Sequence, residues 1–316
     1  MNALERYIAR RLLGTLPVLF GISLLAFTLA QLSPGDPAEL ILEGAGTGAP
    51  TVEEIAALRS YFGLDAPWYT QYGLWLWRLL HGDGGLSYHL GMPVFTALLA
   101  RLPVTGMLAV AALFWAVLGG TLLGLLMTHL RGRIGEIVIR CMTQVFLAMP
   151  AFLTAILLIL VCGVWLHLFP TSGAASPLGY VLPSFALALV TLAMAAQLLD
   201  SQLRTALSSL YVQVARLRGL SEGRILLTYA LPNAVLPVIA MLGNFFAAVL
   251  GGAIIVETVF ALPGIGALAL EAIHYRDYPL LQGYVLFTGG IHVLVTLAVD
   301  LLVARMDPRI VLGGGK

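Results

Sequence analysis

The chain has 316 residues, of which 59% are hydrophobic and only 10% are charged, and its formal net charge is +1. Soluble domains carry about 25% charged residues, so this chain has too few polar side chains to cover the surface of a soluble globule. Its mean hydropathy of +0.94 likewise excludes a disordered chain. The composition predicts a polytopic membrane protein of the all-α class.

Lysine and cysteine set further limits. The only lysine is Lys316, so the chain has no phosphate-binding loop of the Gly-x4-Gly-Lys-Ser/Thr kind, and it has no His-Glu-x-x-His motif. The two cysteines, Cys141 and Cys162, are expected on one helix, 21 residues apart. On a helix this separation is roughly 30 Å, which is far too long for a disulfide bond.

Six apolar stretches are long enough to cross a bilayer, which takes about 20 residues. After a short polar segment, residues 1–11, the first stretch covers 12–32. It resembles a secretory signal peptide, because Arg10 and Arg11 precede it, but its apolar run is longer than the 7–15 residues of such peptides. We therefore expect a membrane anchor that is retained in the mature protein.

A polar insert, residues 33–100, follows the first span. Thr51 and Glu54 have the spacing of a capping box, which predicts a short helix to about residue 61. A second helix is predicted over about 67–81, and its dense Trp and Tyr residues are typical of a helix at the membrane interface. The other five spans form a predicted core, 103–304, followed by a tail, 305–316; they are expected at about 103–129, 136–168, 180–200, 234–256 and 284–304.

The distribution of charge gives the orientation of these spans. With the N-terminus in the cytoplasm, the inner segments hold 13 Lys and Arg residues against six acids, and the outer segments hold four Arg residues against ten acids. Because Lys and Arg accumulate in cytoplasmic loops, we expect both the N-terminus and the C-terminus in the cytoplasm.

The longest inner loop, residues 201–233, is predicted to form a helix–turn–helix. An amphipathic helix over about 205–217 stops at Gly219, a residue type that favours a helix C-terminus, and Ser221 suits the start of the next helix. Small Ala215 and flexible Gly219 would let a partner surface approach closely. A basic face is expected from Arg216, Arg218 and Arg224. The alternative is an ordinary basic cytoplasmic loop.

The spacing in this loop resembles the EAA loop of permeases from ATP-binding cassette (ABC) importers. That pattern is Glu-Ala-Ala-x3-Gly-x9-Ile-x-Leu-Pro, and here Gln213, Val214 and Tyr229 replace its Glu, first Ala and Ile. In that family the loop forms coupling helices that dock in a groove of a separate ATPase subunit, which agrees with the missing phosphate-binding loop. The resemblance implies that coupling depends on Gln213, Ala215, Arg216, Arg218, Gly219, Leu231 and Pro232.

Short motifs over nearly the whole chain are similar to the peptide/nickel permease family, whose members import oligopeptides, dipeptides or nickel. They are Tyr7-Ile8-x-Arg10-Arg11-Leu12-Leu13, Leu32-x-Pro34-Gly35-Asp36-Pro37, Gly63-Leu64-Asp65-x-Pro67, Gly82-Asp83-x-Gly85-x-Ser87, Arg101-Leu102-Pro103-x-Thr105, Val256-Glu257-Thr258-Val259-Phe260-x-x-Pro263-Gly264-Ile265-Gly266, Arg276-Asp277-Tyr278-Pro279 and Asp307-Pro308-Arg309-Ile310. The first and the last resemble the B-type of the two permease subunits in such systems.

The resemblance implies a type I importer permease in a bacterial cytoplasmic (inner) membrane. Its implied partners are a second, C-type permease subunit, one or two ATPase subunits and an extracytoplasmic substrate-binding protein, within the lipid bilayer and without nucleic acid. The resemblance implies no catalytic residue and no cofactor on this chain, because ATP and Mg bind to the ATPase subunits, which drive transport.

Two alternatives remain at this point: a secondary carrier that needs no ATPase, and a membrane assembly protein that transports nothing. A carrier usually has carboxylates or histidines near mid-membrane. Here Glu136, Asp200 and Asp300 are instead expected near inner helix ends.

Acidic residues of the outer segments suggest an entrance for cargo or a docking surface for the binding protein. The residues concerned are Asp36, Asp83, Glu257 and Asp277. They would attract a cationic cargo or a basic protein face. The alternative is solvated loop charge without a role.

Outer histidines raise nickel as a cargo, because imidazole suits Ni. They are His81, His89, His167 and His274. These residues lack the spacing of a ligand set, so we expect no metal site in this chain. The stretch 69–77 resembles nickel permeases somewhat more than dipeptide permeases, which favours nickel or a nickel chelate slightly over short peptides.

Overall fold

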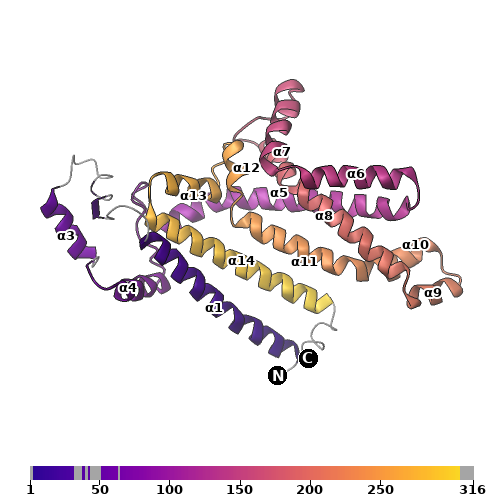
Figure 1. Ribbon diagram of the computed structural model, residues 1–316, viewed down its shortest axis with the longest axis horizontal. Helices are drawn as coiled ribbons and strands as arrows, with labels where there is room; N and C mark the ends of the chain where they lie inside the picture. Colours follow the sequence, from indigo (N-terminus) through magenta and orange to yellow (C-terminus); the bar gives the residue numbers. More distant parts are fainter. Residues whose placement is uncertain (1–2, 32–37, 40–41, 43–50, 63–64, 307–316) are drawn as a thin grey trace.

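The computed structural model describes residues 3–31, 38–39, 42, 51–62 and 65–306, and over these residues the chain is helical without a strand (Figure 1). The α-helices are α1 (Ala3–Gln31), α3 (Val52–Phe62), α4 (Trp68–Leu80), α5 (Val94–His129), α6 (Ile134–Ala148), α7 (Ala151–Leu158), α8 (Val181–Leu207), α9 (Leu210–Leu217), α10 (Glu222–Ile225), α11 (Leu231–Leu250), α12 (Ile254–Val259), α13 (Ile265–His274) and α14 (Tyr278–Met306). Three other helical segments are the π-helices η1 (Ile159–Trp165) and η3 (Leu226–Ala230) and the 3₁₀-helix η2 (Pro177–Tyr180).

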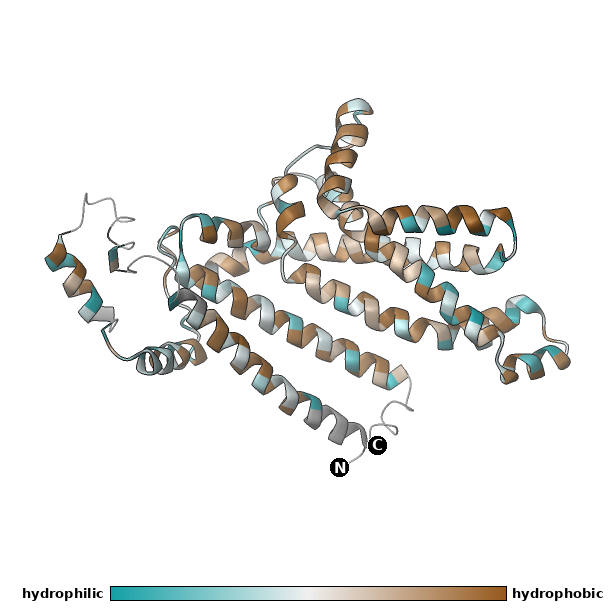
Figure 2. Ribbon diagram, in the orientation of Figure 1, coloured by the Kyte–Doolittle hydropathy of each residue, from teal (hydrophilic) through white to brown (hydrophobic). Residues whose placement is uncertain are grey.

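Five helices among the described residues are long and apolar enough to cross a membrane, and the number is six if the bent pair formed by α6 and α7 counts as one span. Figure 2 shows hydrophobic residues along most of these helices, with hydrophilic residues gathered in the last turns of α8 and in α9 and α10. The predicted all-α, polytopic membrane fold is confirmed.

One predicted span is wrong in its shape. Residues 136–168 do not form a single helix, because α6 and the segment Ala151–Trp165 meet at an angle of 105°. Met149 has an extended backbone (φ −86°, ψ 119°), as the residue before a proline usually does, and Pro150 has no N–H to continue the helix. Cys141 and Cys162 therefore lie on different segments, and both are free thiols. Figure 1 shows α7 standing away from α6.

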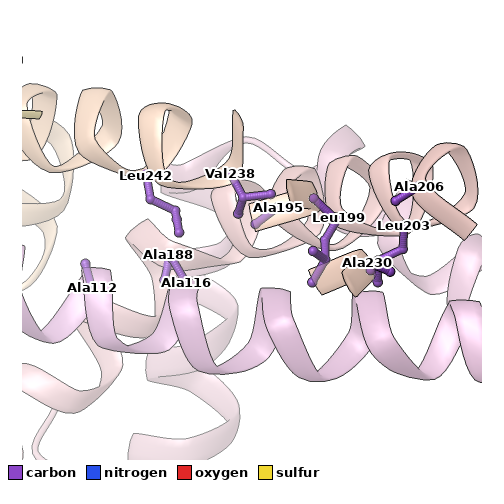
Figure 3. Close-up of a cluster of buried hydrophobic side chains, with 11 residues drawn as sticks. Ala112, Ala116, Ala188, Ala195, Leu199, Leu203, Ala206, Ala230, Val238 and Leu242 are labelled. Atoms are coloured by element: carbon purple, nitrogen blue, oxygen red, sulfur yellow. The ribbon is translucent and has the colours of Figure 1, made fainter. Parts of the chain in front are cut away.

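Small residues let α5 and α8 pack closely along the centre of the bundle. A Cβ atom added at Gly120 would lie 2.6 Å from the Cβ of Ala195, and one added at Gly124 would lie 3.0 Å from the carbonyl oxygen of Ala196. Buried alanines and leucines of α5, α8 and α11 complete this core (Figure 3). Lipid tails are as apolar as these side chains, so close packing rather than burial from water stabilises the contact.

A second layer consists of α1, α14 and α11, with α14 between the other two (Figure 1). Arg11 of α1 forms an ion pair with Asp300 of α14, with 3.1 Å between nitrogen and oxygen. At the other end of α1, the hydroxyl groups of Ser23 and Tyr72 lie 2.8 Å apart, and Phe27 contacts the ring of Tyr72. The aromatic helix α4 is thus fixed to α1.

The capping box predicted for the polar insert is confirmed. The backbone N–H of Thr51 donates to Oε2 of Glu54 at 2.9 Å, and the N–H of Glu54 donates to Oγ1 of Thr51 at 3.4 Å. These hydrogen bonds stabilise the ionised carboxyl group and hold the pKa of Glu54 below its ordinary value. They fix the start of α3 at the predicted residue.

The close packing of α5 on α8 gives a test by substitution. We expect Gly120→Val to lower the yield of folded protein sharply, because the new side chain meets the Cβ of Ala195, and overpacking of this kind costs about 1–3 kcal/mol or more. Gly106→Val is the matched control on the same helix, since no atom lies within 4 Å of a Cβ at Gly106. The measurement is the fraction of monodisperse protein after detergent extraction. Equal fractions for the two variants would contradict the packing described here.

Candidate functional site at the α9 end of the bundle

The predicted helix–turn–helix lies at one extremity of the molecule, which we call the α9 end (Figure 1). Gly219 ends α9 in the left-handed region, with φ +78°. Its N–H donates to the carbonyl of Arg216 at 2.9 Å, and the N–H of Leu220 donates to the carbonyl of Ala215 at 3.3 Å. These two hydrogen bonds form a Schellman motif. Its C′ position, here Gly219, favours glycine because the backbone there has a positive φ. The predicted C-terminal cap is confirmed.

The first helix of the motif begins later than predicted. Residues 205–207 belong to α8, and α9 begins only at Leu210. The hydroxyl groups of Ser208 and Ser209 donate back to the carbonyls of Thr205 and Ala206. Such local hydrogen bonds compete with those of a helix, and they mark the break between α8 and α9.

The two faces of α9 are both apolar, but only one is covered. Val212 and Ala215 are buried against Ile225 of α10, in a small core that Leu207 and Leu220 complete. Ala215 is therefore small because it packs inside the motif, and its side chain does not lie on a partner-facing surface as the sequence suggested. The uncovered face is defined by Leu210, Val214 and Leu217, which are 75%, 41% and 89% exposed. We call these three residues the apolar stripe.

An ion pair closes the motif. Arg216 of α9 donates from Nε to Oε1 of Glu222 at 2.8 Å and from Nη2 to Oε2 at 3.1 Å. These bonds raise the pKa of Arg216 further above its ordinary value. Arg216 thus joins α9 to α10, whereas Arg218 and Gln213 are exposed.

The remaining residues predicted for coupling lie where α11 begins. Leu231 is half-buried and packs against the central core, and Pro232 occupies the first turn of α11, where a missing N–H does no harm. The π-helix η3 links α10 directly to α11. Residues of the EAA-like pattern therefore lie on one continuous motif that ends in a long membrane helix.

A network of charged side chains lies beside this motif. Asp200 of α8 is 2% exposed. Both carboxylate oxygens of Asp200 accept a hydrogen bond from Nε of Arg204 at 3.0 Å. In addition, Nη2 of Arg140 donates to Oδ2 at 3.1 Å, and Oγ1 of Thr128 donates to Oδ1 at 3.0 Å. Arg204 and Arg140 also donate to Oε1 of Glu136, at 2.6 and 3.2 Å. The network joins α5, α6 and α8.

The network explains why these charges are found in an apolar bundle. Asp200 was expected near a helix end with no specific partner, yet it is buried and pairs with two arginines. Sequence reasoning missed Arg140 and Arg204, although each lies four residues after its acid on the same helix, the spacing of a helical ion pair. Glu136 additionally accepts the N–H of Gly132 at 2.7 Å, which fixes the turn between α5 and α6.

Two of the four predicted entrance acids are buried in this structure. Glu257 is 0% exposed; it accepts a hydrogen bond from Oγ1 of Thr105 at 2.7 Å and another from the N–H of Ala267, at the start of α13, at 2.9 Å. Asp277 is also 0% exposed and accepts hydrogen bonds from Oγ of Ser87 and from the N–H of His89. Both carboxylates hold chain segments together and do not face solvent.

The other two entrance acids are placed differently. Asp83 is exposed, and its Oδ1 accepts the N–H of Gly85 at 2.9 Å. Asp36 lies outside the described residues. An acidic entrance thus rests on Asp83 and not on Glu257 or Asp277 in this conformation.

The outer histidines have other contacts. The His89 ring stacks on Tyr275 with 3.6 Å between centroids, and its Nε2 lies 3.4 Å from Oε1 of Glu271. His81 bonds to the carbonyl of Trp77 at 2.8 Å. Within the described part of the chain, no three His, Cys, Asp or Glu residues converge in a way that could hold a metal ion.

Comparison with known proteins shows the family of this chain. The profile of the binding-protein-dependent transport system inner membrane component matches residues 120–312, and the profile of the N-terminal region of such components matches residues 4–109. The chain belongs to this family. The carrier and assembly-protein alternatives are thereby set aside, and this permease is a multi-pass inner membrane protein.

Its relatives have related names. A protein of Brucella suis biovar 1 (strain 1330) described as a peptide transport system permease is 36% identical over 311 residues, covering 96% of this chain and 98% of the relative. The glutathione transport system permease protein GsiC of Escherichia coli (strain K12) is 36% identical over 304 residues, with the same coverage of 96% and 98%. The methionine ABC transporter MetNI, in an inward facing conformation, shares the fold, with a TM-score of 0.57 at 15% identity over 67% of this chain and 97% of that chain.

The network of Asp200 gives a test of stability. We expect Asp200→Asn to destabilise the permease by about 1.5–3 kcal/mol, because the buried carboxylate loses its charge-assisted hydrogen bonds with Arg204 and Arg140. The control is Asp65→Asn, which removes one member of an exposed ion pair with Arg59 and is expected to cost about 1 kcal/mol or less. Thermal unfolding of the two purified variants is the measurement, and an equal fall in midpoint would mean that the network is not buried as described.

Proposed function

We propose that this chain is the membrane-spanning permease subunit of an ATP-driven importer for short peptides, and that the motif 210–230 docks on a separate ATPase subunit. The apolar stripe carries this proposal. Three large apolar side chains on one helix face lie open at the α9 end, on a motif made rigid by a Schellman turn and an ion pair. Uncovered apolar faces on an otherwise closed motif are typical of protein interaction sites.

The orientation follows from the positive charge at the same end. Arg11, Arg140, Arg204 and Arg216 all belong to the α9 end or to helix ends on its side, and cytoplasmic segments accumulate arginine. We infer that the α9 end faces the cytoplasm, with both chain termini on that side. A cytoplasmic ATPase then meets the motif directly.

The other proposed partners are a second permease subunit, one or two ATPase subunits that bind ATP and Mg, and an extracytoplasmic binding protein. The family description names binding-protein-dependent transport, which supports the last of these. In this proposal, ATP binding moves α9 and α10, and the network of Asp200 carries that movement to α5 and α6 because it joins their ends to α8.

The proposed cargo is a short peptide. Relatives that align with almost the whole chain are named for peptides and for glutathione, which is itself a modified tripeptide. Nickel has no comparable support, since no three His, Cys, Asp or Glu residues of the described part of the chain converge in a way that could hold a metal ion.

Docking is tested on the apolar stripe. We expect Leu217→Asp to abolish co-purification with the partner ATPase subunits, because a charge would be buried in an apolar contact. Leu217→Met is the matched control and is expected to keep the association, since it retains an apolar side chain of similar volume. Leu217 is 89% exposed in this chain, so neither change should affect folding. Full co-purification of Leu217→Asp would refute the proposed docking surface.

Cargo is tested by uptake. A strain that lacks only this gene is expected to lose uptake of a labelled di- or tripeptide and to keep uptake of radioactive nickel. A plasmid copy of the gene should restore peptide uptake. Loss of nickel uptake alone would overturn the peptide assignment and leave the docking proposal to be judged by its own experiment.

A further inference from the structure

Two exposed faces of the helix bundle differ in polarity. The exposed face of α5 consists of large apolar residues over four turns, namely Met107, Val110, Phe114, Leu118 and Leu122. The exposed face of α11 has small or polar residues at helical spacing, namely Asn233, Pro237, Asn244 and Ala248. Both helices are long enough to cross the membrane. The face of α5 suits lipid, whereas the two asparagines among the five exposed residues of α11 do not.

A histidine on α14 extends the polar surface of α11. His292 lies midway along the 29 residues of α14 and is exposed. It borders a cavity of about 310 Å³ together with Ala248 of α11, Gly251 just after α11 and Ile22 of α1. Asn244 lies one turn before Ala248 on the same face, about 6 Å along the helix axis. We call Asn233, Pro237, Asn244, Ala248 and His292 the polar face.

Two of the three polar side chains of this face form no hydrogen bond within the described part of the chain. Asn244 and His292 form no hydrogen bond to any described residue, whereas Asn233 donates to the carbonyl of Tyr229 at 2.8 Å. An ionisable or amide side chain that faces lipid at mid-membrane is costly, and such residues almost always face a water-filled path or a polar partner. Lipid is therefore a poor occupant for this face.

We propose that the polar face lines the translocation path and hydrogen-bonds to the backbone of the transported peptide; this rests on the proposed function. Asparagine amide groups and imidazole both donate and accept hydrogen bonds, as the peptide backbone does. None of the five residues carries a fixed charge, so this face would not select peptides by the charge of their side chains. A dry contact with the second permease would leave the amide of Asn244 without partners, which costs about 1–3 kcal/mol for each unpaired group.

The test uses the complete transporter in membrane vesicles, with Cys141 and Cys162 replaced by serine. This background must first retain ATPase co-purification and peptide uptake, so that a failure of the proposed function is detected separately. Single cysteines are then placed at Asn244, at His292 and, as the matched control, at Val110, which is 60% exposed on α5. Each is treated with a charged, membrane-impermeant methanethiosulfonate, which reacts with the thiolate and therefore needs water around the sulfur.

We expect Asn244→Cys and His292→Cys to react about tenfold faster than Val110→Cys, because only a hydrated site supports the thiolate. We also expect both rates to fall when binding protein loaded with peptide is added, because the cargo would cover these positions. Equal slow rates, with labelling only by a lipid-soluble maleimide, would overturn the proposal in favour of lipid. No labelling by either reagent, with or without nucleotide, would overturn it in favour of a sealed contact with the second permease.

A second pair of variants tests the hydrogen bonds themselves. Asn244→Leu is expected to reduce peptide uptake while ATPase co-purification stays unchanged, and Asn244→Gln, which keeps the amide, is expected to retain most uptake. Unimpaired uptake by Asn244→Leu would show that the amide does not contact the cargo.

Discussion

Asp200 is buried between two arginines in a bundle whose other helix contacts are mostly apolar, and the position of the docking motif depends on this arrangement. The carboxylate binds Arg204 on its own helix, Arg140 on α6 and Thr128 on α5. Only Ser208 and Ser209 separate the end of α8 from α9. Because a charge left unpaired in such surroundings is costly, these hydrogen bonds hold the ends of α5, α6 and α8 in one relative position.

At the opposite end of the bundle, buried carboxylates also join separate segments of the chain. Glu257 joins α12 to α5 through Thr105 and to the start of α13, and Asp277 joins the start of α14 to the loop that contains Ser87. Between the two ends, glycine and alanine contacts between α5 and α8 have no polar partners to align them. Buried carboxylates thus set the register at each end, because hydrogen bonds are directional, and small residues supply the close contact in between.

Much of this structure could be predicted from the sequence, because hydropathy and local turn chemistry act over short distances. Gly219 ends α9 as its residue type predicts, and the spans lie where the apolar stretches do. The bend at Pro150 was missed because the apolar stretch continues across it. The burial of Glu257 and Asp277 was not predictable in this way, since their side-chain partners lie 152 and 190 residues away in the sequence.

The α11 helix connects the docking motif with the polar face, and this connection gives the two proposals a common mechanism. The π-helix η3 precedes α11, and wide turns of this kind adjust more readily than regular α-helix, which is why they occur at functional sites. Asn233 lies in the first turn of α11, immediately after Pro232 of the EAA-like pattern. In the proposed mechanism, a displacement of α9 by the ATPase shifts or rotates α11, and a rotation changes which of its residues face the path. In the same mechanism, the network of Asp200 would carry the movement from α8 to the ends of α5 and α6, because it joins the three helices.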